Sequence, residues 1–162
     1  MSAHGVPLIY SPRVQPIRIG WLGRAIAAGV GLVCLAPLVT AALLTPNPSG
    51  LGTHEALGFA PCSFLQSTGL PCPTCGMTTS WAWLARGNVA ASLWVQPMGT
   101  VLALLDIVIF WSAGYIAVSG RPAQHLLRYL PAGYILKLLL ILALAAWAWK
   151  IFIYLHHLDG WK

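Results

Sequence analysis

The sequence predicts an all-α integral membrane protein with three transmembrane helices and a cysteine-bearing loop between the first and the second. Of its 162 residues, 58% are apolar and only 7% are charged, and the mean hydropathy is +0.75. A soluble domain carries about 25% charged residues, so this chain lacks the side chains to cover a water-facing surface. Three apolar runs are each long enough to cross a hydrocarbon core of roughly 30 Å at about 1.5 Å per residue.

The net charge of +6 does not indicate a nucleic-acid-binding protein. Nucleic-acid binding needs Lys and Arg gathered in a patch, whereas the nine basic residues of this chain lie singly near the ends of the apolar runs. That distribution is typical of residues that orient a protein in a membrane. We therefore expect the lipid bilayer, and other membrane-protein subunits, as partners and no nucleic acid.

The first apolar run, residues 21–44, follows an irregular N-terminal tail at residues 1–20 that is broken by three prolines. It is longer than the roughly 7–15 residues of a signal-peptide core, which favours a retained membrane anchor over a cleaved leader. Cys34 lies in the middle of this run, and Pro37 is expected to kink the helix or to mark a packing site. A buried cysteine at such a place is usually a small apolar side chain.

The rest of the chain predicts a loop over residues 45–97 and two further spans, at 98–118 and 132–155, so that residues 21–162 form one three-span domain. Within the loop, residues 77–85 and 89–96 can form short interfacial helices. Between them, Arg86-Gly87-Asn88 is expected to end the first helix and to cap the start of the second. The tryptophans of the short helices and of the third run are interpreted as membrane-belt and helix-contact residues.

Three of the four cysteines fall in the stretch PCSFLQSTGLPCPTCGMTT, residues 61–79. Cys72 and Cys75 form a Cys-x-x-Cys knuckle followed by Gly76, which suits one metal ion because two thiolates one turn apart can reach it. Cys62 adds a third thiolate, and His54 is the only nearby candidate for a fourth ligand. If a metal is bound here, zinc or iron suits this set of ligands.

The same cysteines allow two other interpretations. A Cys-x-x-Cys pair at a helix start can have a lowered thiol pKa, so Cys72 and Cys75, resolved by Cys62, could serve thiol–disulfide exchange. A disulfide from Cys62 to Cys72 or Cys75 would instead be purely structural, as is common in oxidising compartments. All three interpretations predict that the three sulfurs lie close together.

Asp106 lies well inside the second apolar run. A carboxylate at that depth is costly and suggests a functional site by default. We expect Asp106 to face the bundle interior or a partner subunit; the alternative is a shallower position from which the side chain reaches the membrane surface.

The stretch Thr68-Gly69-Leu70-Pro71-Cys72-Pro73-Thr74-Cys75-Gly76-Met77-Thr78, with Cys62 before it and Arg86-Gly87-Asn88 after it, resembles a family of small bacterial membrane proteins. The family is catalogued as a domain of unknown function, number 2752, and the likeness covers roughly residues 60 to 105. The family usually has Gly at the position of Thr74 and Arg at the position of Thr79. The resemblance implies the fold and the importance of the cysteines, and it implies no reaction.

These observations predict a non-catalytic accessory subunit or binding module whose loop is fixed by its cysteines, with a membrane thiol–disulfide oxidoreductase as the alternative.

The basic residues are distributed unequally between the two sides of the spans. The loop side has three, Arg86, Lys150 and Lys162. The other side has six, namely Arg13, Arg18, Arg24, Arg121, Arg128 and Lys137. The larger number of basic residues on that side predicts that the chain lies in a bacterial inner membrane with its N-terminus in the cytoplasm, and with the cysteine loop and the C-terminus outside the cytoplasm.

Overall fold

Three long apolar helices form the frame of the molecule. The computed structural model describes residues 18–122, 132–158 and 160–161. In this part of the chain α1 (Trp21–Leu43), α5 (Pro97–Ser119) and α7 (Ala132–Leu155) are long and apolar enough to cross a membrane, and there is no strand. The predicted fold class is confirmed. Residues 1–17 of the expected tail and Arg128 of the expected connection lie outside the described residues.

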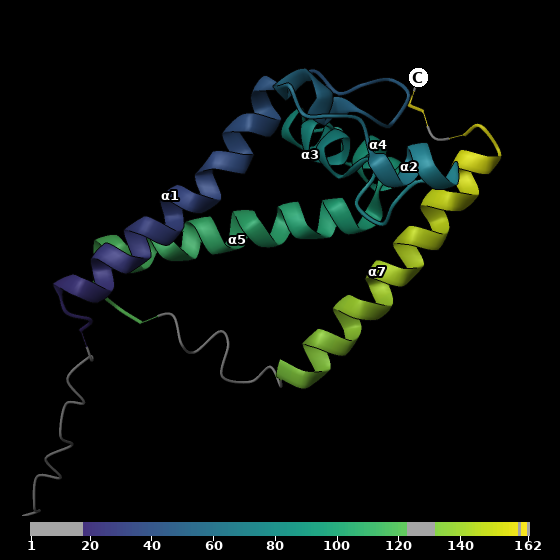
Figure 1. Cartoon of the computed structure of the whole chain (residues 1–162). Helices are drawn as coiled ribbons and strands as arrows, with labels where there is room; N and C mark the ends of the chain where they lie inside the picture. Colours follow the sequence, from purple (N-terminus) through teal and green to yellow (C-terminus); the bar gives the residue numbers. More distant parts are fainter. Residues whose placement is uncertain (1–17, 123–131, 159, 162) are drawn as a thin grey trace, which may run out of the picture.

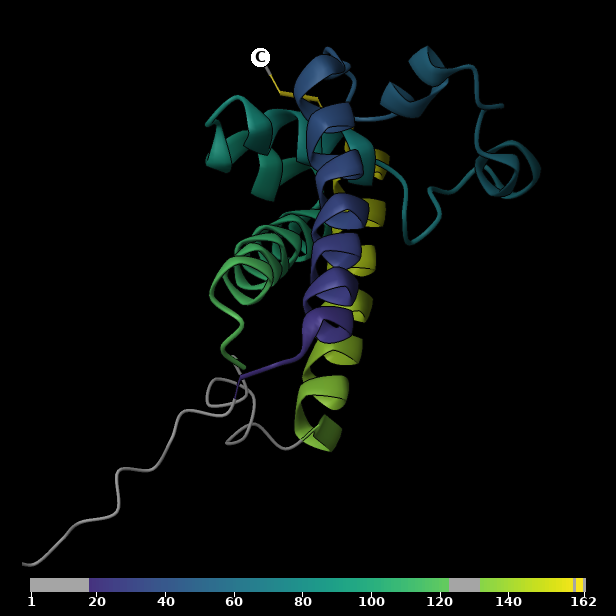
Figure 2. The same cartoon turned by 90° about the vertical axis from the view of Figure 1, so that its left-hand side faces the viewer.

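Short helices fill the segment between α1 and α5 and gather at one end of the long helices (Figures 1 and 2). They are the 3-10 helix η1 (Thr53–Leu57), α2 (Ser63–Thr68), α3 (Met77–Ala85) and α4 (Val89–Val95). The expected helices at 77–85 and 89–96 correspond to α3 and α4. Asn88 caps α4 as predicted, because its Oδ1 accepts a 2.9 Å hydrogen bond from Ala91 N.

Small residues bring α1 and α5 together as an antiparallel pair. Ala27, Gly31 and Cys34 are buried on α1, facing buried Ala103 and Ala113 of α5. Without a hydrophobic driving force between helices in lipid, small side chains allow the close packing that holds such a pair. The many exposed leucines, isoleucines and valines of the long helices are then the surface that lipid covers.

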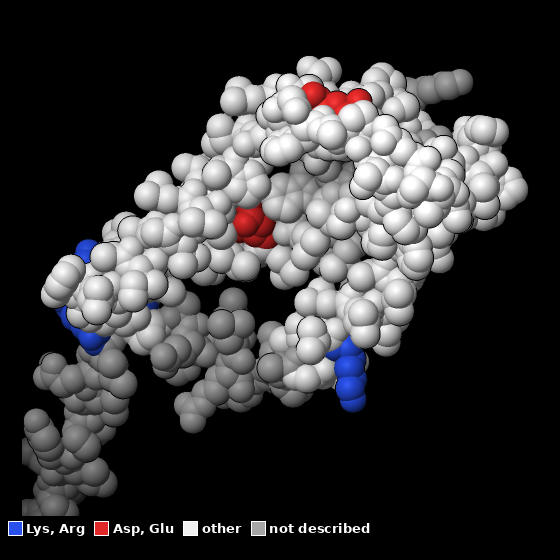
Figure 3. Space-filling view, viewed as in Figure 1, with Lys and Arg blue, Asp and Glu red and all other residues white. Residues whose placement is uncertain are grey.

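The basic end of the frame is distinct from the end that carries the short helices. Arg24, near the start of α1, donates from Nε to Ala117 O at 2.8 Å and from an Nη atom to Val118 O at 3.1 Å, at the end of α5. Figure 3 shows the Lys and Arg side chains of this face at the ends of the long helices, away from the short helices. Arg24 thus ties the start of α1 to the end of α5.

Asp106 lies half-buried on α5 beside Cys34 of α1. Its Oδ2 atom is buried and has no hydrogen-bond partner among the described residues. Its expected place in the bundle interior or against a partner subunit, and a functional role for Asp106, stay predictions.

Helix α7 diverges from α1 and α5 towards its beginning (Figure 1). Tyr134, Leu136 and Leu140 in its first half are exposed, whereas Lys150 and Ile153 in its second half have no exposed surface. The third span is therefore attached to the rest mainly at the end where the short helices lie.

Candidate metal centre

The knuckle at Cys72 and Cys75 is a tight turn that leads directly into α3. Cys75 N donates to Cys72 O at 3.0 Å and Met77 N donates to Thr74 O at 3.1 Å. Gly76 then adopts φ +84° as the N-cap of α3, a left-handed conformation that glycine enters without steric cost. This turn directs the Cys72 and Cys75 side chains towards each other, with their Sγ atoms 3.2 Å apart.

Cys62 reaches the knuckle from the start of α2. Helix α2 spans only six residues and is capped at its end by Gly69, which has φ +72° and reverses the chain towards Pro71. As a result the sulfurs of Cys62, Cys72 and Cys75 all lie within 4.8 Å of one another. The proximity expected from the sequence is confirmed.

The spacing of the sulfurs suits a single metal ion. Two thiolates bound to one ion at about 2.3 Å each are at most about 4.6 Å apart, so small side-chain rotations bring all three sulfurs into range. Cys75 is buried and the other two cysteines are half-buried. The three cysteines can hold a metal, and all four cysteines of the chain are free thiols in the structure.

The thiols of the knuckle differ in acidity. Burial disfavours the Cys72 thiolate, but hydrogen bonds from Thr74, Cys75 and Cys62 outweigh it and lower the pKa of Cys72. The Thr74 hydroxyl lies 3.2 Å from Cys72 Sγ. Burial, together with the neighbouring Cys72 and Cys62 thiols, raises the pKa of Cys75 to about 12.

In reduced, metal-free protein, iodoacetamide is therefore expected to alkylate Cys72 before Cys75. A lowered pKa means that the Cys72 thiolate forms at a lower pH than an ordinary thiolate, whereas Cys75 stays protonated until its pKa of about 12 is approached. Mass spectrometry of peptides after alkylation between pH 6 and pH 10 measures both rates. Modification of Cys75 before Cys72 would contradict the assignment.

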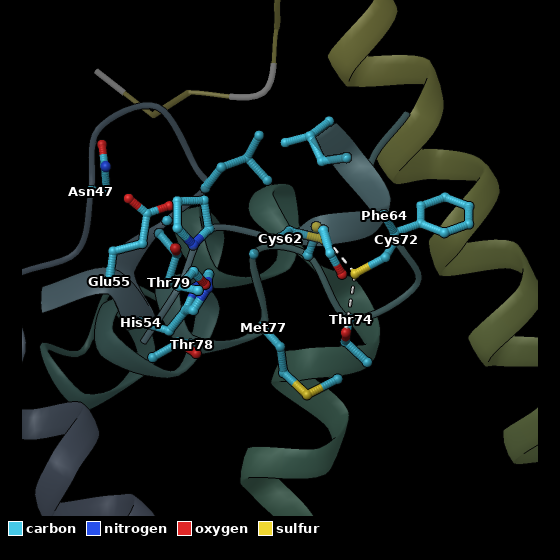
Figure 4. A pocket seen from close by; sticks show the side chains of 18 of the residues that line it. Asn47, His54, Glu55, Cys62, Phe64, Cys72, Thr74, Met77, Thr78 and Thr79 are labelled. Atoms are coloured by element: carbon cyan, nitrogen blue, oxygen red, sulfur yellow. Dashed lines mark hydrogen bonds between the residues drawn. The ribbon is translucent and has the colours of Figure 1, made fainter. Parts of the chain in front are cut away.

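The sulfurs lie in the wall of a cavity of about 820 Å³. Figure 4 shows Cys62 and Cys72 on one side of this cavity and His54 and Glu55 on the other. His54 is not part of the sulfur cluster, and its Nε2 lies 3.3 Å from Ala60 O. The structure brings together the three cysteines but not His54, whose role as fourth ligand stays a prediction.

Three contacts of this site were not foreseen from the sequence. Gln96 Nε2 donates to Pro73 O at 2.7 Å, and Trp147 Nε1 donates to Pro71 O at 3.0 Å. Thr79, where the resembling family usually has Arg, is buried and shares a 2.7 Å hydrogen bond with the hydroxyl of Thr53. The Thr79 side chain therefore ties the first part of the loop to α3 and brings no positive charge.

Comparison with known proteins supports the likeness noted in the sequence. Residues 62–110 match the model of one protein family. That family is described as "Protein of unknown function (DUF2752)". The matched stretch contains all three clustered cysteines and runs into α5, but it leaves out α1 and α7. No curated protein and no solved structure matches the chain.

Proposed function

We propose that this chain is a non-catalytic membrane protein whose loop binds one thiophilic metal ion, zinc or iron, through Cys62, Cys72 and Cys75. The observation that carries the proposal is the mutual distance of the three sulfurs, all within 4.8 Å. Soft thiolate ligands select zinc and iron over magnesium and calcium. The ion fixes the loop, and the chain acts as a binding module or an accessory subunit in its membrane.

Three protein ligands leave one position of a tetrahedral ion open. Structural zinc sites take four protein ligands, whereas a site with three keeps the fourth for water or another molecule. Within the described residues the cluster supplies three sulfurs, and the cavity of about 820 Å³ lies beside them. A donor atom that enters this cavity, from His54 or from a bound partner, would complete the coordination.

The experiment uses the full chain purified in a mild detergent under reducing conditions and exposed to Zn²⁺ or Fe²⁺. After desalting we expect one ion per chain, and we expect Cys62, Cys72 and Cys75 to resist alkylation together until a chelator removes the ion. A chain that retains no metal, or whose three thiols react equally with and without it, would refute the proposal.

We further propose that the loop lies outside the cytoplasm of a bacterial inner membrane. The support is the arrangement in which Arg18, Arg24 and Arg121 share the end of the frame opposite the cysteine loop, since basic residues favour the cytoplasmic side. A reporter fused after Lys162 should then be active only if it functions outside the cytoplasm. Cytoplasmic reporter activity would reverse the orientation.

Thiol–disulfide exchange is the second candidate function, and the close approach of the Cys72 and Cys75 sulfurs, 3.2 Å apart, favours it. The Cys72 thiolate would attack a substrate disulfide and form a mixed disulfide, releasing one substrate thiol. Cys75, with its Sγ 3.2 Å away, would then displace the second thiol, leaving a Cys72–Cys75 disulfide and a reduced substrate. A trapped mixed disulfide in a Cys75→Ser variant, together with no metal in the wild type, would favour this function.

A further inference from the structure

The two carbonyl groups on either side of Cys72 are held by side chains from distant parts of the chain. Pro71 O accepts from Trp147 Nε1 of α7, and Pro73 O accepts from Nε2 of Gln96, which has no exposed surface. Both prolines have a fixed φ, so anchoring their carbonyls leaves the backbone at Cys72 little freedom. These two hydrogen bonds therefore fix the backbone from which the Cys72 side chain projects.

Two further hydrogen bonds of α7 reach segments between α1 and α5. Lys150 Nζ donates to Gly50 O at 3.3 Å, and it lies 3.2 Å from the place that a Cβ atom at Gly76 would occupy. Trp149 Nε1 donates to Trp94 O at 2.9 Å, on α4 and not on the knuckle itself. Because the first half of α7 is exposed, it is the second half of this helix that packs against the rest of the molecule.

We propose that Trp147 is a positioning residue of the metal centre, through which metal binding and the docking of α7 stabilise each other. This inference rests on the metal binding proposed above. Trp147 touches no sulfur in the proposed role; it acts through Pro71 O on the geometry of Cys72. Since coupling between two equilibria is reciprocal, the ion should also strengthen the attachment of α7.

The chain offers a matched control for this proposal. Trp147→Phe and Trp149→Phe each keep an aromatic ring on α7 and each remove one indole donor from a backbone carbonyl. Only Trp147 bonds to the knuckle. We expect Trp147→Phe to weaken Zn²⁺ binding by the full chain about tenfold, the order of one lost hydrogen bond. Trp149→Phe should change the affinity for Zn²⁺ by less than about twofold.

A second measurement separates positioning from general loss of stability. Hydrogen–deuterium exchange in the second half of α7 should slow on addition of Zn²⁺ in the wild type and in Trp149→Phe, but much less in Trp147→Phe. If Trp147→Phe does not fold, benzothienylalanine at position 147 keeps the shape of the indole and removes its N–H. That variant should show the same loss of affinity.

The outcomes distinguish this inference from the proposed function. If the wild type binds Zn²⁺ but Trp147→Phe and Trp149→Phe have equal affinities, the positioning role is wrong and the metal site stands. If the wild type binds no metal, the proposed function fails and this inference fails with it. If Zn²⁺ affinity falls in Trp147→Phe but not in Trp149→Phe, and hydrogen–deuterium exchange in α7 of Trp147→Phe no longer responds to Zn²⁺, the metal site and the positioning role are both supported.

Discussion

Cys75→Ser is expected to weaken metal binding by at least about 100-fold, which corresponds to about 2.7 kcal/mol. The substitution replaces one of three thiolates by a hydroxyl that does not ionise, so the ion keeps only two sulfur ligands. Competition with a chromophoric chelator measures the affinity of the purified chain.

Cys34→Ser is the control, because Cys34 and Cys75 are both 8% exposed and only Cys75 belongs to the cluster. The control should bind metal like the wild type, although it changes a buried cysteine in the same way. Equal losses in both variants would show that the effect comes from altered packing rather than from a lost ligand.

Gly76→Ala is expected to cost more than about 3 kcal/mol of stability, and to remove metal binding with it. A Cβ atom at this position would lie 2.7 Å from Gly50 O and 3.2 Å from both Lys150 Nζ and Val95 Cγ1. Gly50, Val95 and Lys150 are all buried, so these neighbours have little room to move. Thermal unfolding of the detergent-solubilised protein, followed by circular dichroism, measures the loss.

Gly58→Ala separates this crowding from backbone strain. Gly58 has φ +83°, almost the φ of +84° at Gly76, but nothing lies within 4 Å of its added Cβ. It should therefore show only the cost of a left-handed alanine, about 1 kcal/mol. Equal destabilisation by both substitutions would mean that the close approach of Gly50 and Lys150 to Gly76 does not matter.

The sequence predicts the membrane frame well, because an apolar run longer than 20 residues has few other structures open to it. The first span differs from its expected limits by one residue, and the second begins at Pro97 rather than at residue 98. Proline at the first position of a helix costs no hydrogen bond, so Pro97 starts α5 instead of preceding it. The proximity of the cysteines in the knuckle could be predicted equally well, because these residues are close in the sequence.

Contacts between distant segments could not be predicted in this way. His54 was grouped with the cysteines because it is near in sequence, but the turns of η1 and α2 leave it across the cavity. Trp147 was interpreted as a belt or helix-contact residue. It lies 76 residues after Pro71 in the sequence, and its hydrogen bond to Pro71 O forms only because α7 docks beside the knuckle. A local sequence pattern does not contain information about such a distant contact.

X-ray absorption spectroscopy of the zinc-loaded protein tests the central claim most directly. The account predicts three sulfur neighbours at about 2.3 Å from the ion, falling to two in Cys62→Ser and unchanged in Cys34→Ser. A first coordination shell made only of nitrogen and oxygen, or one that Cys62→Ser leaves unaltered, would contradict a metal centre built on these three cysteines.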